Sequence, residues 1–157
     1  TPQYSEIGSD GTRYIVAARD ARTPLTDPSE IEMTDPKLTF IRPGRPPFHA
    51  TAATGTVDTQ THDVRVPGLA SVTTDDGLYG TMYDVRADMR AQITTADGPV
   101  DITMPDGSHL TADDLHYDGN TNTWTFGNAT LLVPDLPVRT VSWMNAFAAF
   151  SVDEEAP

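Results

Sequence analysis

The sequence predicts an all-β protein whose short strands recur as a two-strand module of about thirty residues. Three observations support this prediction. Turn signals return roughly every 8–12 residues. Apolar and polar residues alternate between the turns, and the whole pattern repeats along the chain. Thirteen prolines and eleven glycines supply the turns, and the length of 157 residues is that of one domain.

The clearest copy of the module is segment 106–133, DGSHLTADDLHYDGNTNTWTFGNATLLV. It begins at Asp106-Gly107, and Asp76-Gly77 stands thirty residues earlier in the same role. Other positions recur in the same way. The recurring aspartates are Asp58, Asp88 and Asp118, the strand pairs are Val64-x-Val66, Thr94-x-Ala96 and Trp124-x-Phe126, and the glycines that follow them are Gly68, Gly98 and Gly127. We therefore predict one two-strand unit that is used at least three times.

The first forty residues are a weaker version of this pattern. Residues 1–11 are polar and end in an Asp-Gly turn, and segment 13–21 then begins with strand-forming residues and is predicted to be a degenerate first module. A short helix is the alternative there. Segment 23–29 contains two prolines and is predicted to be a loop. Residues 30–34 and the residues after Pro36 alternate as two short strands.

A turn is predicted at 42–47, RPGRPP, and the alternation after it changes phase. Phe48, Ala50 and Ala52 alternate, but Gly55 and Val57 resume one residue out of phase. The same change separates Leu110 and Ala112 from Leu115 and Tyr117. A repeated phase change at one place indicates a β-bulge or bend in each module. The remaining strands are predicted within 78–87, 92–104 and 106–133.

The chain is expected to divide into a β domain at 1–137 and a C-terminal extension at 138–157. Pro134 and Pro137 interrupt the last strand. Trp143, Phe147 and Phe150 then have helical spacing, although a last strand could also pass through Trp143. The acidic end, 153–157, is expected to be disordered.

Composition excludes several classes of function. A net charge of −13 opposes binding to nucleic acid and to anionic membrane surfaces. The chain has no cysteine and therefore no thiol chemistry or disulfide. No apolar run is long enough to span a membrane. The sequence begins at Thr1 rather than at methionine, so we expect that a signal peptide or anchor preceded it.

Catalytic and metal-binding patterns are not found. His49, His62, His109 and His116 lack the paired spacing of metal ligands and are expected to be exposed strand or turn residues. Asp75-Asp76 precedes Gly77 and is expected to form a turn, and Asp113-Asp114 lies at the phase change. No nucleophile with an identifiable base occurs. The sequence therefore predicts a protein that is not an enzyme and that uses no metal or cofactor.

The inward-facing residues of the modules form a long apolar strip in which small and bulky side chains alternate. We predict that this strip comprises Tyr14, Val16, Phe48, Ala50, Ala52, Val57, Val64, Val66, Met82, Val85, Ile102, Leu110, Ala112, Leu115, Trp124 and Phe126. It is either the filled core of a sandwich or an open groove for an elongated apolar ligand. Repeated modules of uniform cross-section suit a chain-like ligand or a chain of partner proteins.

The modules resemble the LptC/LptA/OstA family of lipopolysaccharide export proteins. The resemblance is carried by GTRYIVAA at 11–18, FHATAATGTVD at 48–58, DGSHLTADDLHYD at 106–118 and WTFG at 124–127, and it covers roughly residues 7–133. The order of the segments is more similar to LptC than to LptA, because a short divergent part containing Thr34-Asp-Pro36 precedes the clear repeats.

This resemblance implies an open β-jellyroll, or β-taco, of two facing antiparallel sheets. It implies a periplasmic protein, anchored to the inner membrane by an N-terminal helix that this chain lacks. Such a protein accepts lipopolysaccharide from an inner-membrane ABC transporter and holds the acyl chains between its sheets. It then passes the lipid to an LptA-like protein that joins it by β-strand augmentation. The aromatic residues of segment 138–157 depart from the family pattern at the end expected to meet that partner.

Two alternatives belong to other functional classes. One is a structural module that stacks end to end and binds no lipid. The other is a carbohydrate-binding β-sandwich that uses Trp124 or Trp143 as a platform, although Trp124 lies in register with the presumed inner row.

Overall fold

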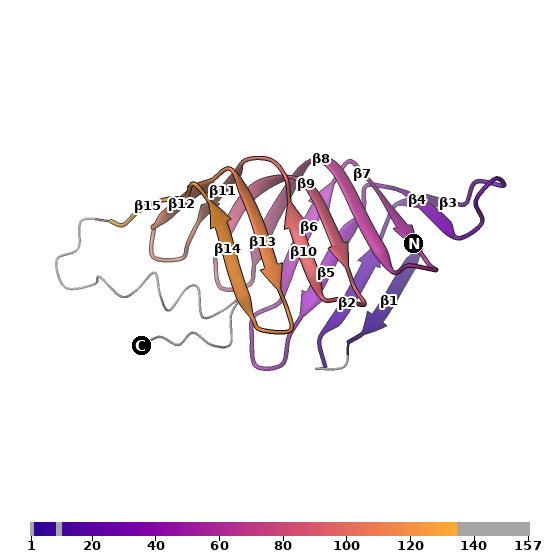
Figure 1. Cartoon of the computed structure of the whole chain (residues 1–157), viewed down its shortest axis with the longest axis horizontal. Helices are drawn as coiled ribbons and strands as arrows, with labels where there is room; N and C mark the ends of the chain where they lie inside the picture. Colours follow the sequence, from indigo (N-terminus) through magenta and orange to yellow (C-terminus); the bar gives the residue numbers. More distant parts are fainter. Residues whose placement is uncertain (1, 9–10, 135–157) are drawn as a thin grey trace.

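The structure is a computed structural model that describes residues 2–8 and 11–134. Within these ranges it contains strands and turns but no helix, and each strand is antiparallel to its neighbours (Figure 1). The strands are β1 (Gln3–Ile7), β2 (Arg13–Ala17), β3 (Asp20–Arg22), β4 (Glu30–Thr34), β5 (Lys37–Ile41), β6 (Phe48–Ala52), β7 (Thr54–Asp58), β8 (Asp63–Thr74), β9 (Tyr79–Asp88), β10 (Ile93–Ala96), β11 (Val100–Thr103), β12 (His109–Ala112), β13 (Asp114–Asp118), β14 (Thr123–Gly127) and β15 (Thr130–Leu132).

These strands form one hydrogen-bonded sheet that is folded into two facing layers, here named sheet I and sheet II. Sheet I has the order β1-β2-β5-β6-β8-β9-β11-β12-β15, and sheet II has the order β3-β4-β7-β8-β9-β10-β13-β14. The long strands β8 and β9 belong to both layers. The first part of β8 pairs with β7 and its last part with β6, and β9 is divided in the same way between β10 and β11. This topology confirms the predicted all-β fold of two facing antiparallel sheets.

The chain bends wherever it passes from one sheet to the other, and the bends lie along one side of the molecule, the upper side in Figure 1. Ala53 separates β6 from β7, and Asp113 separates β12 from β13. In β8 the pairing shifts between Val66 and Leu69, where Gly68 has a φ of 75°. A residue with a side chain adopts that conformation at a cost of about 1–2 kcal/mol. The predicted phase change is therefore a bend in the strands.

Three turns of one type, spaced thirty residues apart, close sheet II at the side opposite the bends. Each begins with an aspartate whose Oδ1 accepts a hydrogen bond from the backbone N–H two residues later, at 2.8 Å for Asp58, 3.1 Å for Asp88 and 2.9 Å for Asp118. The fourth residue after each aspartate has a positive φ; these residues are His62, Gln92 and Asn122. Backbone hydrogen bonds of 3.0 and 2.7 Å join consecutive turns. The thirty-residue repeat is therefore a stack of equivalent turns.

The side of the molecule that carries these turns is named the open side. Sheet II reaches it at turns 59–62, 89–92 and 119–122, and sheet I reaches it at turns 42–47 and 75–77, among others. In Figure 1 the β5–β6 turn and the β13–β14 turn lie along the lower side, opposite the bends. The two sheets are joined covalently along the bends, and among the described residues they meet through side chains at the open side.

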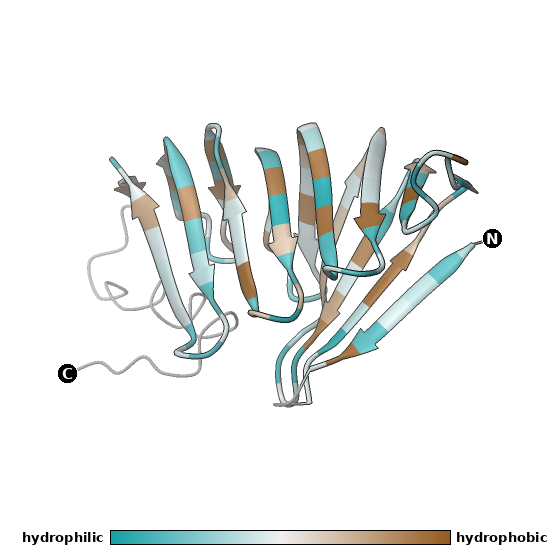
Figure 2. Ribbon diagram, turned by 45° about the vertical axis from the view of Figure 1, so that its right-hand side comes forward, coloured by the Kyte–Doolittle hydropathy of each residue, from teal (hydrophilic) through white to brown (hydrophobic). Residues whose placement is uncertain are grey.

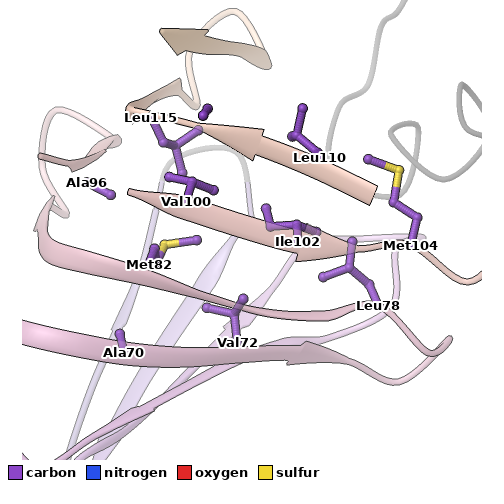
Figure 3. Packing of buried hydrophobic residues seen from close by; sticks show 11 residues of the cluster. Ala70, Val72, Leu78, Met82, Ala96, Val100, Ile102, Met104, Leu110 and Leu115 are labelled. Atoms are coloured by element: carbon purple, nitrogen blue, oxygen red, sulfur yellow. The ribbon is translucent and has the colours of Figure 1, made fainter. Parts of the chain in front are cut away.

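The core lies between the two sheets. Apolar and polar residues alternate along the strands (Figure 2), so that one face of each strand is apolar. The larger cluster of buried residues includes Val72, Met82, Ile102 and Leu110, which four neighbouring strands place side by side (Figure 3). The smaller cluster lies towards the N-terminal end and includes Val57, which is completely buried. Burial of these side chains is the main stabilising contribution to the fold.

Strand β1 was not predicted, because residues 1–11 read as a polar stretch that ends in a turn. All five residues of β1 pair with β2, from Gln3 with Ala17 to Ile7 with Arg13. Only Tyr4 and Glu6 are half-buried, so the strand has no run of apolar residues that would have revealed it. Its position at the sheet edge explains why so polar a segment can form a strand.

Two further expectations concern the ends of the chain. The C-terminal extension, 138–157, lies outside the described residues, and the division of the chain at residue 137 stays a prediction. Among the residues that the structure describes, we find no helix that is long and apolar enough to cross a membrane.

Candidate functional site

The candidate site is an apolar cavity of about 60 Å³ between the two sheets. Strands of both sheets contribute to its wall, and most of the side chains that line it are aliphatic or aromatic. A smaller space of about 10 Å³ lies beside it, bounded by Leu78, Met104 and Phe126 among others. The interior of this state of the protein is therefore nearly filled, with a small void along its centre.

The structure places the predicted strip between the sheets. The members that line the larger cavity are Tyr14, Val16, Phe48, Ala50, Ala52, Val64, Val66, Met82, Val85, Leu115 and Trp124. Ile102 and Phe126 border the smaller space, whereas Val57, Leu110 and Ala112 are packed in the core. The strip is thus the inner lining of the folded sheet, and the contact of these residues with a lipid stays a prediction.

Several lining residues were not included in the predicted strip. They are Met33, Leu38, Phe40, Ala70, Val72, Ala87 and Tyr117. Leu38 and Phe40 alternate within β5, and Tyr117 follows Leu115 at a spacing of two in β13. The period-two rule that selected the other residues would have selected these three as well.

Aromatic side chains cross from sheet I to sheet II near the open side. Phe40 of β5 lies 5.1 Å from Tyr14 of β2 and 6.0 Å from Tyr117 of β13, measured between ring centroids. Tyr117 in turn lies 4.4 Å from Trp124 of β14. Such tilted and edge-to-face pairs each contribute about 0.5–1.5 kcal/mol beyond the area they bury. All four rings line the cavity.

An arginine lies directly over this aromatic cluster. The Arg42 side chain follows β5 and is only 8% exposed. Its Cζ lies 5.6 Å from the Phe40 ring centre and 5.9 Å from that of Tyr117. Its Nη1 donates to the Tyr117 hydroxyl at 3.3 Å and to Asn122 Oδ1 at 3.5 Å. The arginine therefore connects the β5–β6 turn of sheet I with the last turn of sheet II.

A second polar contact connects the sheets at the N-terminal end. His62 Nδ1, in the first turn of sheet II, is hydrogen bonded to the Glu6 carboxylate of β1. The Tyr4 hydroxyl donates to Glu6 Oε1 at 2.9 Å and lies 3.3 Å from His62 Nδ1. The prediction that the histidines are exposed is therefore wrong for His62 and for His49, whose side chains are 21% and 23% exposed. The partner carboxylate belongs to β1, the strand that the sequence did not reveal.

Burial and the hydrogen bond to Glu6 raise the pKa of Tyr4 from its usual value of 10.0 to about 12. The folded protein therefore keeps this proton more tightly than the unfolded chain does, and stability present below pH 10.0 is lost as the pH rises towards about 12. We expect the urea midpoint to fall less steeply over this range in Tyr4→Phe than in the wild type. Tyr79→Phe, on the exposed outer face, controls for the loss of a hydroxyl, and equal slopes for all three proteins would contradict the expectation.

The remaining titratable groups of the described residues lie apart in pairs. Asp113 accepts a hydrogen bond from Asn128 Nδ2 at 2.8 Å across the bend. At the surface, the Oδ1 atom of Asp75 lies 3.1 Å from His49 Nε2. In the described part of the chain, no group of three or more histidine or carboxylate residues could hold a metal ion. The arrangement is suited to enclosing apolar matter between two walls.

A folded, unclosed antiparallel sheet with an apolar interior defines the open β-jellyroll class. The chain is similar in fold to LptH, the LptA homologous periplasmic component of the conserved lipopolysaccharide transport device from Pseudomonas aeruginosa. The superposition covers 76% of this chain and 94% of that chain, with a TM-score of 0.54 and 11% sequence identity. At this identity the likeness is one of fold, and it confirms the predicted β-jellyroll. No family model matches the chain, and no curated protein matches it in sequence.

Proposed function

We propose that the protein is a periplasmic, non-enzymatic lipid carrier that holds the acyl chains of lipopolysaccharide between its two sheets. The observation that carries this proposal is the apolar cavity, which lies between layers joined covalently along one side only. The likeness in fold to a lipopolysaccharide transport component supports the choice of lipid.

Loading requires the two sheets to move apart. Pockets for small molecules usually measure about 300–1,000 Å³, and the cavity of about 60 Å³ is far smaller than that. The inter-sheet contacts of Arg42 and His62 at the open side would separate, while the bends act as the hinge. Each Å² of apolar surface that an acyl chain covers contributes about 25 cal/mol of favourable binding free energy, which offsets the cost of opening.

The sheet ends support the proposed exchange with protein partners. Each of the terminal strands β1, β3, β14 and β15 has one strand partner among the described residues, which leaves its outer edge available for a further strand. In the LptC-like arrangement that we propose, an inner-membrane ABC transporter delivers lipid at one end and an LptA-like protein receives it at the other. Attachment to the inner membrane is part of the same proposal.

A fluorescence titration tests whether acyl chains enter the cavity. The chain has two tryptophans, so Trp143→Phe leaves Trp124, which lines the cavity, as the only one. We expect lipopolysaccharide to change the Trp124 emission saturably, because acyl chains displace Tyr117 from the indole ring. Fully deacylated lipopolysaccharide should leave the emission unchanged. An equal response to both would show that the protein recognises the sugar instead.

A photo-crosslinker in living cells tests the same proposal without purified lipid. Val66 and Thr73 both lie in β8, but Val66 lines the cavity and Thr73 is exposed. We expect a crosslinker at Val66 to capture lipopolysaccharide and one at Thr73 to capture none. Equal capture at both positions would contradict binding between the sheets.

The stacking module without lipid remains the second candidate, because the same terminal strands of the described sheet support end-to-end assembly. The carbohydrate-binding alternative loses its platform at Trp124. That indole is half-buried between the sheets, 4.4 Å from Tyr117 and 6.4 Å from Phe126 between ring centres. The other proposed platform, Trp143, lies outside the described residues.

A further inference from the structure

We propose that the β5–β6 turn, 42–47, is the binding site for an anionic group, a phosphate, in the head of the bound glycolipid. Arg42 and Arg45 supply the positive charge and Asn122 of the facing turn supplies a polar partner. This inference rests on the proposed lipid-carrier function and adds to it a defined place for the head group.

The position of Arg42 fits the boundary between acyl chains and head group. Its guanidinium lies over the rings of Phe40 and Tyr117, both of which line the cavity. On its other side lies the turn that contains Asn122, at the open side of the molecule. A lipid whose chains enter between the sheets from the open side presents its head group there. The head group would therefore meet Arg42 at the point where apolar wall gives way to polar turns.

The turn holds its two arginines in a restricted backbone. Its sequence is Arg42-Pro-Gly-Arg45-Pro-Pro, and the prolines limit φ at three of its six positions. Arg45 N–H donates to the Arg42 carbonyl at 3.1 Å, which closes the turn and brings the two residues together. Arg45 is half-buried. The turn thus places the backbone of Arg45 beside that of Arg42, whose guanidinium lies over the rings of Phe40 and Tyr117.

The charges around the open side favour this turn over its neighbours. Aspartates predominate in and beside the other turns described above; they are Asp58, Asp75, Asp76, Asp88 and Asp118. These turns also contain one arginine, Arg90. The chain as a whole carries −13. A phosphate is repelled along most of this side and is attracted to the turn that carries two arginines and no carboxylate.

The chemistry of the side chains identifies the ligand class. A guanidinium presents parallel N–H donors that match the oxygens of a phosphate, and such charge-assisted pairs are about twice as strong as neutral hydrogen bonds. The Asn122 side-chain amide, whose Oδ1 accepts from Arg42 Nη1, lies beside this position as a polar group. Since Arg42 also connects the two sheets, engagement of a phosphate would release its bonds to Tyr117 and Asn122 and favour opening.

The test compares a bis-phosphorylated lipid A with the same lipid after enzymatic removal of both phosphates. Affinities are measured by Trp124 fluorescence in the Trp143→Phe background. We expect the protein to bind the phosphorylated lipid about tenfold more tightly, or better, because two charge-assisted contacts are made. In Arg42→Gln/Arg45→Gln this preference should disappear, and high salt should reduce it in the starting protein.

The matched control is Arg65→Gln/Arg86→Gln. These two arginines face each other across β8 and β9 on the exposed outer face of sheet II, so the pair removes the same charge away from the open side. The control should keep the preference for phosphate. If it loses the preference as the 42/45 variant does, overall charge is responsible and the site is wrong. Arg45→Gln alone, at a half-buried position, should reduce the preference if the 42/45 variant does not fold.

The outcomes separate this inference from the function on which it rests. Binding of neither lipid A to the starting protein would overturn the lipid-carrier proposal itself. Equal binding of the two lipids, with or without the arginines, would overturn only the head-group site.

Discussion

Replacing Ala50 with tryptophan is expected to abolish the binding of acyl chains while the protein stays folded. Ala50 lies in β6, pairs with Leu38 and Val72, and faces the cavity. An indole in place of a methyl group would occupy more than the about 60 Å³ that the cavity offers. Overfilling of this kind costs about 1–3 kcal/mol of stability. After each protein is purified with lipopolysaccharide, fatty-acid analysis should find bound lipid on the wild type and almost none on the variant.

Ser71→Trp is the control for this experiment. Ser71 pairs with Thr51 on the neighbouring strand and is exposed on the outer face of sheet I. The Ser71→Trp variant adds the same indole beside the same part of β8, but outside the cavity. Its lipid loading should equal that of the wild type. Full loading of Ala50→Trp would show that the chains bind elsewhere.

Leu115→Ala is expected to have the largest effect on stability, lowering the free energy of unfolding by about 2–5 kcal/mol. Leu115 is 3% exposed in β13 and packs in the larger core cluster as well as against the cavity. Its removal enlarges a void that is already present, and the neighbouring walls belong to paired strands that cannot collapse into it. Urea unfolding followed by circular dichroism measures the change.

Leu69→Ala provides the comparison at an exposed site. Leu69 is 48% exposed at the bend of β8. The substitution removes the same atoms from the surface, so the free energy of unfolding is expected to change by no more than about 0.5 kcal/mol. If both variants lost the same small amount, the interior would be a loosely packed groove rather than the nearly filled core described here.

The repeats made the fold predictable because their signals are local. The aspartates at 58, 88 and 118 accept backbone hydrogen bonds within their own turns, so the sequence of a single turn reveals its structure. The bend after Ala112 shows in the sequence because side chains on either side of Asp113 must change face to stay between the sheets. The alternation of apolar and polar residues then predicted most of the inner lining. Applied to Phe40 and Tyr117, the same rule would have predicted these two lining residues as well.

The contacts at the open side could not be predicted in the same way. Arg42 meets Tyr117 across 75 residues, and His62 meets Glu6 across 56. Each contact depends on how far the two sheets twist towards one another, which no local pattern encodes. Strand β1 was missed for a related reason. Its residues are polar, and it becomes a strand only because the edge of β2 is present to pair with it.

The stack of equivalent turns has a consequence for how such a protein can change its length. Along the sheet, each thirty-residue unit is hydrogen bonded through its backbone to the unit before it and the unit after it, by the bonds between turns and by the strands on either side. Duplication of one unit would insert two bent strands and leave the strand pairing within the other units intact. With strands about 4.7–4.9 Å apart, each duplication would lengthen the molecule by about 9.5 Å. A gain or loss of units would thereby change the length of the protein in fixed steps.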